Sequence, residues 1–232
     1  MPAVSGRRKR KLGGAARRGQ RRLLPWAAMK AYPSIDTRVA SGEPLIVWDK
    51  LDGSNIRAEW EPKRGFFQFG TRHRVIDERA PVFGEAIGLV RGGPADALHA
   101  VFKARKWKHA VAYFEFHGPG SFAGEHAAEP HVVTLIDVAA DKRGLLEPNV
   151  FRQLFADVAL LPRVLHEGAV DDEFVARVRA SELPGLTFEG VVCKGAYASP
   201  GMPRMFKVKT QRWLDRLRVK CGDDEALFER LR

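Results

Sequence analysis

The sequence predicts an α+β domain built on antiparallel sheets, and two observations lead to that class. Runs of residues that suit strands are numerous, and they are not regularly interleaved with helical patterns. A doubly wound parallel sheet would show that regular interleaving, which argues against it. The chain has 232 residues and 45% hydrophobic content, which is enough to build a substantial core.

The first two expected strands flank a polar turn. Leu45–Asp49 is a short apolar run typical of a buried strand, and Ile56–Trp60 alternates apolar and polar residues. Gly53 between them suits a turn with unusual backbone angles. We therefore expect a hairpin that displays residues 50–55 at its tip. Further strands are expected at Gly65–Phe69, Val111–Phe116, His131–Val138, Leu186–Lys194 and Arg204–Lys209.

Helical patterns occupy the intervening segments and the end of the chain. Asp171–Ser181 opens with acids, which suit a helix N-terminus. Residues 211–232 are expected to form a short helical C-terminal extension of one or two helices. The other expected helices are Val82–Val90, Ala95–Lys108 and Asn149–Val158.

The N-terminal segment differs from the body of the chain in charge. Residues 1–25 hold nine Lys and Arg and no acid, so removing them from the net charge of +11 leaves 11 − 9 = +2. This segment is rich in Gly, Ala and Arg and lacks periodic apolar positions, so we expect residues 1–28 to be a disordered basic arm. Such an arm suits phosphates. The alternative is that the native protein starts at Met29 and the arm is not native; both stay open.

Composition also bears on the class of protein and its surroundings. No segment approaches the roughly 20 consecutive apolar residues of a membrane span, and the N-terminus lacks the apolar core of a secretory signal. Cys193 and Cys221 form no CxxC pair, which argues against a disulfide scaffold or a cysteine-rich zinc site. His117, His126 and His131 lack metal-site spacing and suggest solvent or phosphate contacts. We expect a cytoplasmic protein without membrane attachment.

Several expected strands carry charged residues where a core strand would be apolar. The two-residue period points Glu115 away from its phenylalanine neighbours and places Glu189 on one face with Val191 and Cys193. Lys207 and Lys209 share the opposite sign and one strand face. Each charge taken singly is typical of a solvated edge residue. Taken in order after Lys50, which follows an apolar strand, they indicate a charged cleft.

This ordered set resembles the motifs of the covalent nucleotidyltransferases, the superfamily of ATP-dependent nucleic-acid ligases and capping guanylyltransferases. The resemblance spans roughly residues 30–210 and implies a nucleotidyltransferase fold for residues 29–210, with antiparallel sheets flanking an ATP cleft and peripheral helices. The matching segments are Lys50-Leu51-Asp52-Gly53, Phe114-Glu115-Phe116-His117-Gly118, Glu189-Gly190-Val191-Val192-Cys193-Lys194 and Lys207-Val208-Lys209.

Three further features are similar to the RNA ligase 2 type of ATP-dependent RNA ligase. Asn55 stands where DNA ligases and capping enzymes usually place an arginine, five residues after the nucleophile. The Gly118-Pro119-Gly120 turn and the opening Tyr32-Pro33-Ser34-Ile35 also look like that subfamily. The resemblance therefore implies an RNA ligase that adenylates itself, transfers AMP to an RNA 5′-phosphate and seals it to a 3′-hydroxyl.

The chemistry assigns roles to these residues. Lys50 is the expected nucleophile, and because a protonated amine cannot attack, we expect Lys207 and Lys209, together with partial desolvation, to lower its pKa. These two lysines and Mg²⁺ (or Mn²⁺) are the expected stabilisers of the α-phosphate, with Asn55 and Glu189 holding the metal partly through water.

The resemblance also implies the groups that bind ATP. Glu115 would bind the ribose, and Arg72 would contact the nucleotide or the RNA phosphate, with Arg74 as an alternative for that role. Ile136 takes the place of the family's adenine-stacking aromatic and offers only apolar contact. Further residues expected to bind the nucleotide are Asp49, Leu51, Asp52 and Lys194.

The expected partner is RNA, as a nicked duplex or broken ends, and an RNA/DNA hybrid is a further candidate. Only 23 residues follow Lys209, so grip on the RNA would depend on the catalytic domain, the basic arm or a partner protein. Alternatives are a minimal DNA ligase, a capping-type enzyme that uses GTP, and a non-catalytic nucleic-acid-binding relative.

Overall fold

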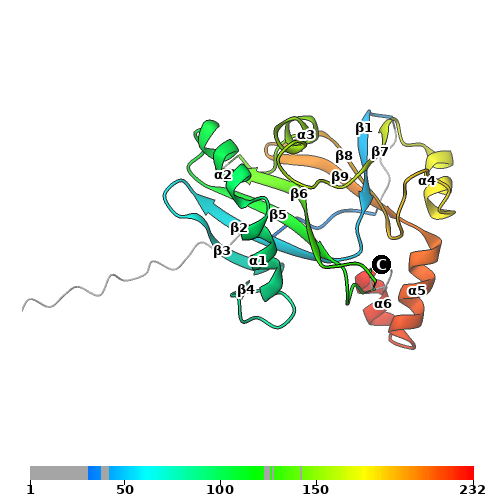
Figure 1. Cartoon of the computed structure of the whole chain (residues 1–232). Coiled ribbons are helices and arrows are strands. Elements are labelled where there is room, and N and C mark those ends of the chain that lie inside the picture. Colours follow the sequence, from blue (N-terminus) through cyan, green and yellow to red (C-terminus); the bar gives the residue numbers. More distant parts are fainter. Residues whose placement is uncertain (1–30, 38–41, 123–125, 127, 142) are drawn as a thin grey trace, which may run out of the picture.

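The computed structural model describes residues 31–37, 42–122, 126, 128–141 and 143–232, and the expected basic arm lies outside them. Two antiparallel sheets form the centre of the molecule (Figure 1). One has the strand order β7-β1-β8-β9 and the other β4-β3-β2-β5-β6. The predicted α+β class with antiparallel sheets is confirmed. The strands are β1 Leu45–Lys50, β2 Ser54–Glu61, β3 Gly65–Thr71, β4 Val75–Ile76, β5 Ala110–His117, β6 Val132–Ala140, β7 Val164–Gly168, β8 Gly190–Ser199 and β9 Met202–Lys209.

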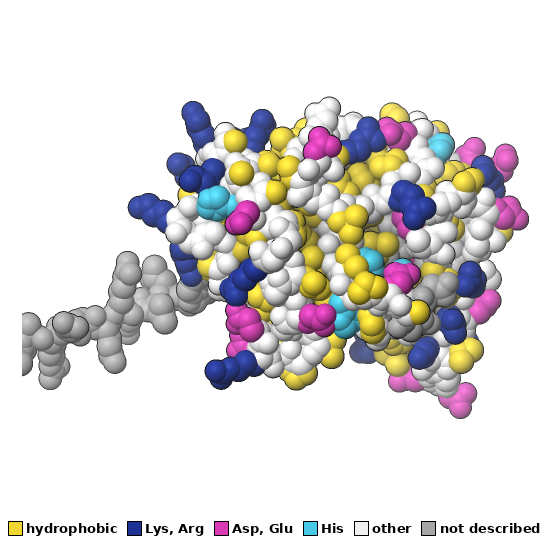
Figure 2. Space-filling view, in the orientation of Figure 1, with side chains coloured by type: hydrophobic (Ala, Val, Ile, Leu, Met, Phe, Trp, Pro, Cys, Tyr) yellow, Lys and Arg dark blue, Asp and Glu magenta, His cyan; other side chains and the backbone are white. Residues whose placement is uncertain are grey.

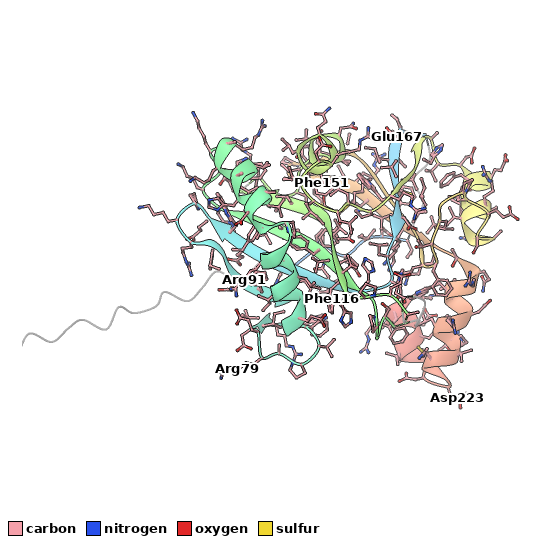
Figure 3. The ribbon with its side chains drawn as sticks, viewed as in Figure 1. Arg79, Arg91, Phe116, Phe151, Glu167 and Asp223 are labelled. Carbon is pink, nitrogen blue, oxygen red and sulfur yellow. The ribbon has the colours of Figure 1, made fainter. Side chains whose placement is uncertain are left out.

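The helices lie around these sheets. Helices α1 and α2 cover one face of the five-stranded sheet, whereas α5 and α6 lie together at the end of the molecule near the C-terminus (Figure 1). Phe151 of α3 packs edge-on against Trp48 of β1, with ring centroids 6.0 Å apart (Figure 3). The helices are α1 Gly84–Gly92, α2 Ala95–Ala104, α3 Pro148–Phe155, α4 Asp172–Arg179, α5 Gln211–Cys221 and α6 Glu225–Leu231.

Strand β1 is buried on both faces. Ile46 and Trp48 join the core that the five-stranded sheet shares with α1, α2 and α3. Leu45 and Val47 join a second core beneath β8, β9 and α4. This double burial explains why the strand is a continuous apolar run rather than an alternating one. It also places Lys50, at the end of β1, between the two sheets.

The predicted hairpin between β1 and β2 is wrong. Strand β1 pairs with β7 and β8, whereas β2 pairs with β3 and β5, so residues 51–53 cross from one sheet to the other. The local pattern identified both strands but could not identify their partners. Glycine is required at position 53, because a Cβ there would lie 2.5 Å from the carbonyl oxygen of Phe116.

Two predicted elements have different bounds for identifiable reasons. Helix α2 ends at Ala104 rather than Lys108, because Lys106 adopts a positive φ of 58° and Trp107 turns back into the core against Phe102. The strand expected from Leu186 begins only at Gly190, which has a φ of 140°, and it continues to Ser199. The positive φ interrupts the alternation, so Glu189 does not share the apolar face of Val191 and Cys193.

Two strands had not been predicted. Strand β7 is an edge strand in which no residue is fully buried, and β4 has only two residues. Neither therefore leaves a strong apolar pattern in the sequence. At the N-terminus of α4, the expected acidic start is confirmed: the Asp171 side chain accepts a hydrogen bond of 2.8 Å from the Phe174 backbone N–H.

The molecular surface mixes both signs of charge. Figure 2 shows Lys and Arg side chains gathered at the end formed by α2 and the turn between β2 and β3, with acids interspersed elsewhere on this face. Lys103, Arg105, Lys106 and Lys108 are exposed there, whereas Trp107 is buried. Within the described ranges, no helix combines the length and the apolar character that crossing a membrane requires.

Candidate active site

A cavity of about 600 Å³ lies between the two sheets, a volume typical of sites for small ligands. Nine of the twelve predicted site residues line it, from strands of both sheets and the loops that follow them: Asp49, Lys50, Leu51, Asn55, Arg72, Glu115, Ile136, Lys194 and Lys207. The other three, Asp52, Glu189 and Lys209, lie directly behind this wall. The fold therefore brings together residues that are up to 160 positions apart in the chain.

Lys50 is half-buried at the end of β1, opposite Gly190 of β8. Its Nζ donates a hydrogen bond of 2.7 Å to Glu189 Oε2. Burial lowers the pKa of Lys50, but the nearby carboxylates of Glu189 and Glu115 outweigh it, so the pKa is raised. The expected lowering of the Lys50 pKa by Lys207 and Lys209 is therefore wrong for the protein without nucleotide, because Glu189 lies in direct contact.

The lysines whose pKa values are lowered are instead Lys207 and Lys209, near the end of the chain. Lys209 Nζ lies 3.2 Å from Glu189 Oε1 and 3.5 Å from the centre of the Trp213 ring. Burial lowers the pKa of Lys209 to about 7 despite the opposing charge of Glu189. Burial and the Lys50 charge also lower the pKa of Lys207. The two Nζ groups donate to backbone carbonyls at the end of α6, those of Leu231 and Arg232.

Glu115 faces Asn55 across the β2–β5 pair. Burial raises the pKa of Glu115 to about 8, and Glu189 adds to the rise whereas Lys50 opposes it. The carboxyl group therefore holds a proton at neutral pH. It can donate a hydrogen bond to a ribose hydroxyl and accept one from it. Asn55 Nδ2 donates to the Phe114 carbonyl oxygen at 3.4 Å.

Lys194 lines the cavity but is held by protein groups. Its Nζ donates hydrogen bonds of 2.7 Å to Asp137 Oδ2 and to the Ile136 carbonyl oxygen. Asp137 also accepts a hydrogen bond of 2.5 Å from the Tyr32 hydroxyl. This buried network positions the Ile136 side chain on the cavity wall and ties the start of the described chain to β6.

Two predicted nucleotide-binding carboxylates are likewise occupied by the protein. Asp49 Oδ1 accepts hydrogen bonds of 3.1 Å from both the backbone N–H and the hydroxyl of Thr187, and burial raises the pKa of Asp49. Asp52 Oδ1 accepts one of 3.3 Å from Trp213 Nε1 on α5. These carboxylates therefore anchor the segment around Lys50.

The loop after β3 supplies the exposed positive charge of the site. Arg72 and Arg74 both line the cavity, so the geometry keeps both as candidates for a phosphate contact. The sequence reasoning missed Trp48 and Trp213, and it quoted Tyr32 only as part of a motif. A signal for Trp48 was available, because an aromatic residue two positions before a nucleophile that ends a strand lies on the same strand face.

The residues present fit a nucleotide and a hard cation. Within the described part of the chain, two buried polar atoms of the cavity lining lack a hydrogen-bond partner: Asn55 Oδ1 and Trp48 Nε1. An unpartnered buried polar atom is unfavourable unless a ligand satisfies it. An amide oxygen next to carboxylates suits Mg²⁺ or Mn²⁺, and a ring N–H beside an apolar wall suits an acceptor on a nucleotide.

Comparisons with known proteins identify the fold. No protein-family model matches the chain, and no relative is found among curated proteins. Among solved structures, the chain is similar to the Naegleria gruberi RNA ligase. A mutant with AMP and Mn has a TM-score of 0.55 and 15% identity over 75% of this chain and 52% of that one. An apo mutant, described as R4a, has a TM-score of 0.56 and 16% identity over 80% and 59%.

The same ligase with PPi gives a TM-score of 0.55 at 15% identity. The chain thus spans between half and three fifths of the length of these solved structures. The predicted arrangement of antiparallel sheets with peripheral helices is confirmed as the fold shared with these solved structures.

Proposed function

We propose that this protein is an ATP-dependent RNA ligase whose Lys50 is adenylated as the first step. The observation that carries the proposal is the contact of 2.7 Å between Lys50 Nζ and Glu189 at the wall of a nucleotide-sized cavity. Arg72 and Lys207 line the same cavity and supply positive charge for phosphates. The solved structures similar to this chain include an RNA ligase with AMP, ATP and PPi, which supports the same chemistry.

In the first step, neutral Lys50 attacks the α-phosphorus of ATP. The N–P bond forms, the bond from the α-phosphorus to the bridging oxygen breaks, and pyrophosphate leaves with that oxygen. The ammonium loses two protons on the way to the phosphoramidate. Glu189 Oε2 is placed to take the first at 2.7 Å, and the second passes to solvent. Glu189 therefore holds Lys50 charged before ATP binds and accepts its proton afterwards.

Lys207 and Lys209 stabilise the charge that develops on the α-phosphate. Since the pKa of Lys209 is about 7, this side chain is only partly charged before an anion binds. A bound phosphate raises its pKa and completes its protonation. Both lysines must then leave the α6 carbonyls that they contact in the nucleotide-free enzyme.

Asn55 and Glu189 are the proposed ligands of Mg²⁺ or Mn²⁺, partly through water. The cation would supply charge neutralisation at the phosphates. Asn55 Oδ1 has no partner among the residues the structure describes. Glu189 is paired with two lysines, but adenylation removes the positive charge of Lys50. Once Glu189 has passed the accepted proton to solvent, the oxygen that contacted Lys50 is available to the cation.

The later steps use the same groups. An RNA 5′-phosphate oxygen attacks the α-phosphorus, the N–P bond breaks and Lys50 is regenerated. An adjacent 3′-hydroxyl then attacks the activated 5′-phosphorus, and AMP leaves. Each step is an in-line displacement that depends on positioning and electrostatics. The proposed substrate is RNA at a nick or at broken ends, including RNA in a hybrid with DNA.

The test is incubation of the full chain with labelled ATP or labelled GTP, followed by a denaturing gel. We expect a labelled band from ATP that is lost in Lys50→Ala and kept in Lys103→Ala, which changes an exposed lysine on α2. A second assay compares how fast the protein seals nicked duplexes that carry RNA or DNA at the 3′-hydroxyl side. We expect faster sealing with RNA.

The alternatives predict different results. Labelling by GTP would indicate a capping-type enzyme, and equal sealing of all-DNA nicks would indicate a DNA ligase. No band from either nucleotide, with folded protein and divalent metal present, would overturn the proposal in favour of a binding protein.

A further inference from the structure

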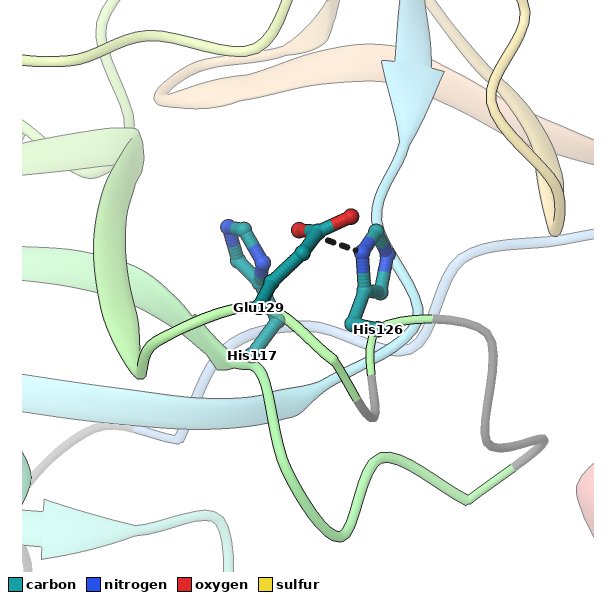
Figure 4. A group of neighbouring side chains, drawn as sticks. All are labelled: His117, His126 and Glu129. Atoms are coloured by element: carbon teal, nitrogen blue, oxygen red, sulfur yellow. Dashed lines mark hydrogen bonds and ion pairs between the residues drawn. The ribbon is translucent and has the colours of Figure 1, made fainter.

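A second group of potential ligands lies outside the cavity. His117 ends β5, and His126 and Glu129 belong to the segment before β6 (Figure 4). One ligand atom from each residue lies within 4.8 Å of the other two, and the two imidazole side chains are buried. His126 Nδ1 lies 3.0 Å from Glu129 Oε2, and the two histidine rings have centroids 5.0 Å apart.

The hydrogen bond of His117 Nε2 leaves the other ring nitrogen, Nδ1, able to bind a metal ion. His117 Nε2 lies 3.1 Å from the hydroxyl of Thr134, which is buried. When Nε2 donates its proton to this hydroxyl, Nδ1 carries a lone pair. A second partner that fixes the tautomer in this way is typical of histidines that bind metals.

Two buried nitrogen atoms of this group also lack a partner. Among the residues that the structure describes, His117 Nδ1 and His126 Nε2 accept and donate no hydrogen bond. Only 9% of the His117 surface and 5% of the His126 surface are exposed. A buried nitrogen without a partner is costly, and an ion bound to His117 Nδ1 removes that cost.

We propose that His117, His126 and Glu129 bind a zinc ion. Two imidazole nitrogens and one carboxylate oxygen are a donor set that zinc accepts, and three protein ligands leave a fourth position for water. Imidazole favours transition metals over Mg²⁺ and Ca²⁺, which prefer oxygen ligands. The ion would bind one nitrogen of each imidazole and one carboxylate oxygen of Glu129.

This proposal departs from the expectation of solvent or phosphate contacts for two of the three histidines. His117 and His126 are nine positions apart, which matches no common zinc motif, but their rings lie side by side with centroids 5.0 Å apart (Figure 4). His131 is not part of the group. Its Nδ1 contacts Glu85 and its Nε2 contacts the Pro119 carbonyl, each at 2.7 Å.

The site would brace the segment that carries the nucleophile. A Cβ atom at Gly53 would lie 3.0 Å from His117 Cβ, so His117 lies directly against the crossing between the sheets. None of the three ligands lines the ATP cavity. Zinc would therefore act by holding His126 and Glu129 against the end of β5, and its binding does not depend on the proposed ligase activity.

The experiment is a zinc titration of the full chain without nucleotide, against a competing chromophoric chelator and in excess Mg²⁺. We expect one zinc per chain. The variants are His126→Gln and Glu129→Gln, and His131→Gln is the control, a histidine near the site but outside it. Because the Glu129 side chain is 56% exposed, Glu129→Gln should fold normally, which circular dichroism checks.

We expect zinc affinity to fall at least about 10-fold in Glu129→Gln and about 100-fold in His126→Gln, and to stay unchanged in His131→Gln. Cobalt in place of zinc should give visible absorption of a four-coordinate site. The proposal is overturned if zinc binds well below one per chain, or if Glu129→Gln and His126→Gln bind it as tightly as the unmodified chain.

Discussion

At the scale of single residues, the charges around Glu189 govern the site. The order of Lys50, Glu115, Glu189, Lys207 and Lys209 in the sequence indicated a charged cleft, and the structure places them together. The sequence could not indicate which lysine contacts which carboxylate. That detail reverses the expected direction of the Lys50 pKa, because the nearby carboxylates, with Glu189 at 2.7 Å, outweigh the effect of burial.

Glu115→Gln tests the raised pKa of this carboxyl group. The native state holds a proton on Glu115 up to about pH 8, whereas an ordinary glutamate releases it near pH 4.5. Since the native state binds more protons in that window, Glu115 lowers the free energy of unfolding as pH rises from 4.5 to 8. The Glu115→Gln variant lacks this dependence. The difference in free energy of unfolding, variant minus unmodified protein, should therefore increase by about 1–3 kcal/mol from pH 4.5 to pH 8.

The measurement is urea unfolding of both proteins across that pH range. Glu182→Gln is the matched control, because Glu182 is exposed, and its stability should follow the unmodified protein. A constant difference between Glu115→Gln and the unmodified protein at every pH would contradict the raised pKa.

At the scale of elements, periodicity identified strands well but not their partners. Strands β1 and β2 were both predicted, yet they belong to different sheets, since pairing depends on contacts far apart in the chain. The grouping of His117 with His126 was missed for the same reason, because it follows no sequence motif. The start of β8 at Gly190 and the end of α2 before Lys106 were placed wrongly because each depends on one residue with a positive φ angle.

Gly190→Ala tests how the start of β8 is built. A Cβ at this position would lie 2.1 Å from the Val208 carbonyl oxygen, and the φ of 140° is strained for alanine. We expect a loss of about 2–4 kcal/mol in the free energy of unfolding. Gly88→Ala in α1 is the control: a Cβ there meets nothing within 4 Å. It should stabilise by about 0.5–1 kcal/mol. Similar effects in the two variants, measured by urea unfolding, would refute this account of the strand start.

At the scale of the whole molecule, the cleft lies among several packed clusters. Strand β1 contributes to a core on each of its faces, and α5 and α6 pack around Phe188, Trp213 and Leu217 in a further cluster. Helix α6 reaches the cavity through Leu231. The sequence predicted helices near the C-terminus but not this contact, because nothing in the local pattern relates α6 to Lys209.

Nucleotide binding should therefore loosen α6. Lys207 and Lys209 donate to the carbonyls of Arg232 and Leu231, and they must release them to contact phosphates. With α,β-methylene ATP, which binds but cannot adenylate, we expect faster amide hydrogen exchange in α6, whereas α2 stays unchanged as an internal reference. Exchange in α6 that is slower or unaltered at saturating analogue would contradict competition between α6 and phosphate.

The most direct test of the proposed chemistry is to locate the adenylate by peptide mass spectrometry after incubation with ATP and divalent metal. We expect one AMP per chain on the peptide that contains Lys50, released by mild acid because the bond is a phosphoramidate. An adduct on a different lysine, or unmodified Lys50 in folded protein with saturating ATP, would contradict it.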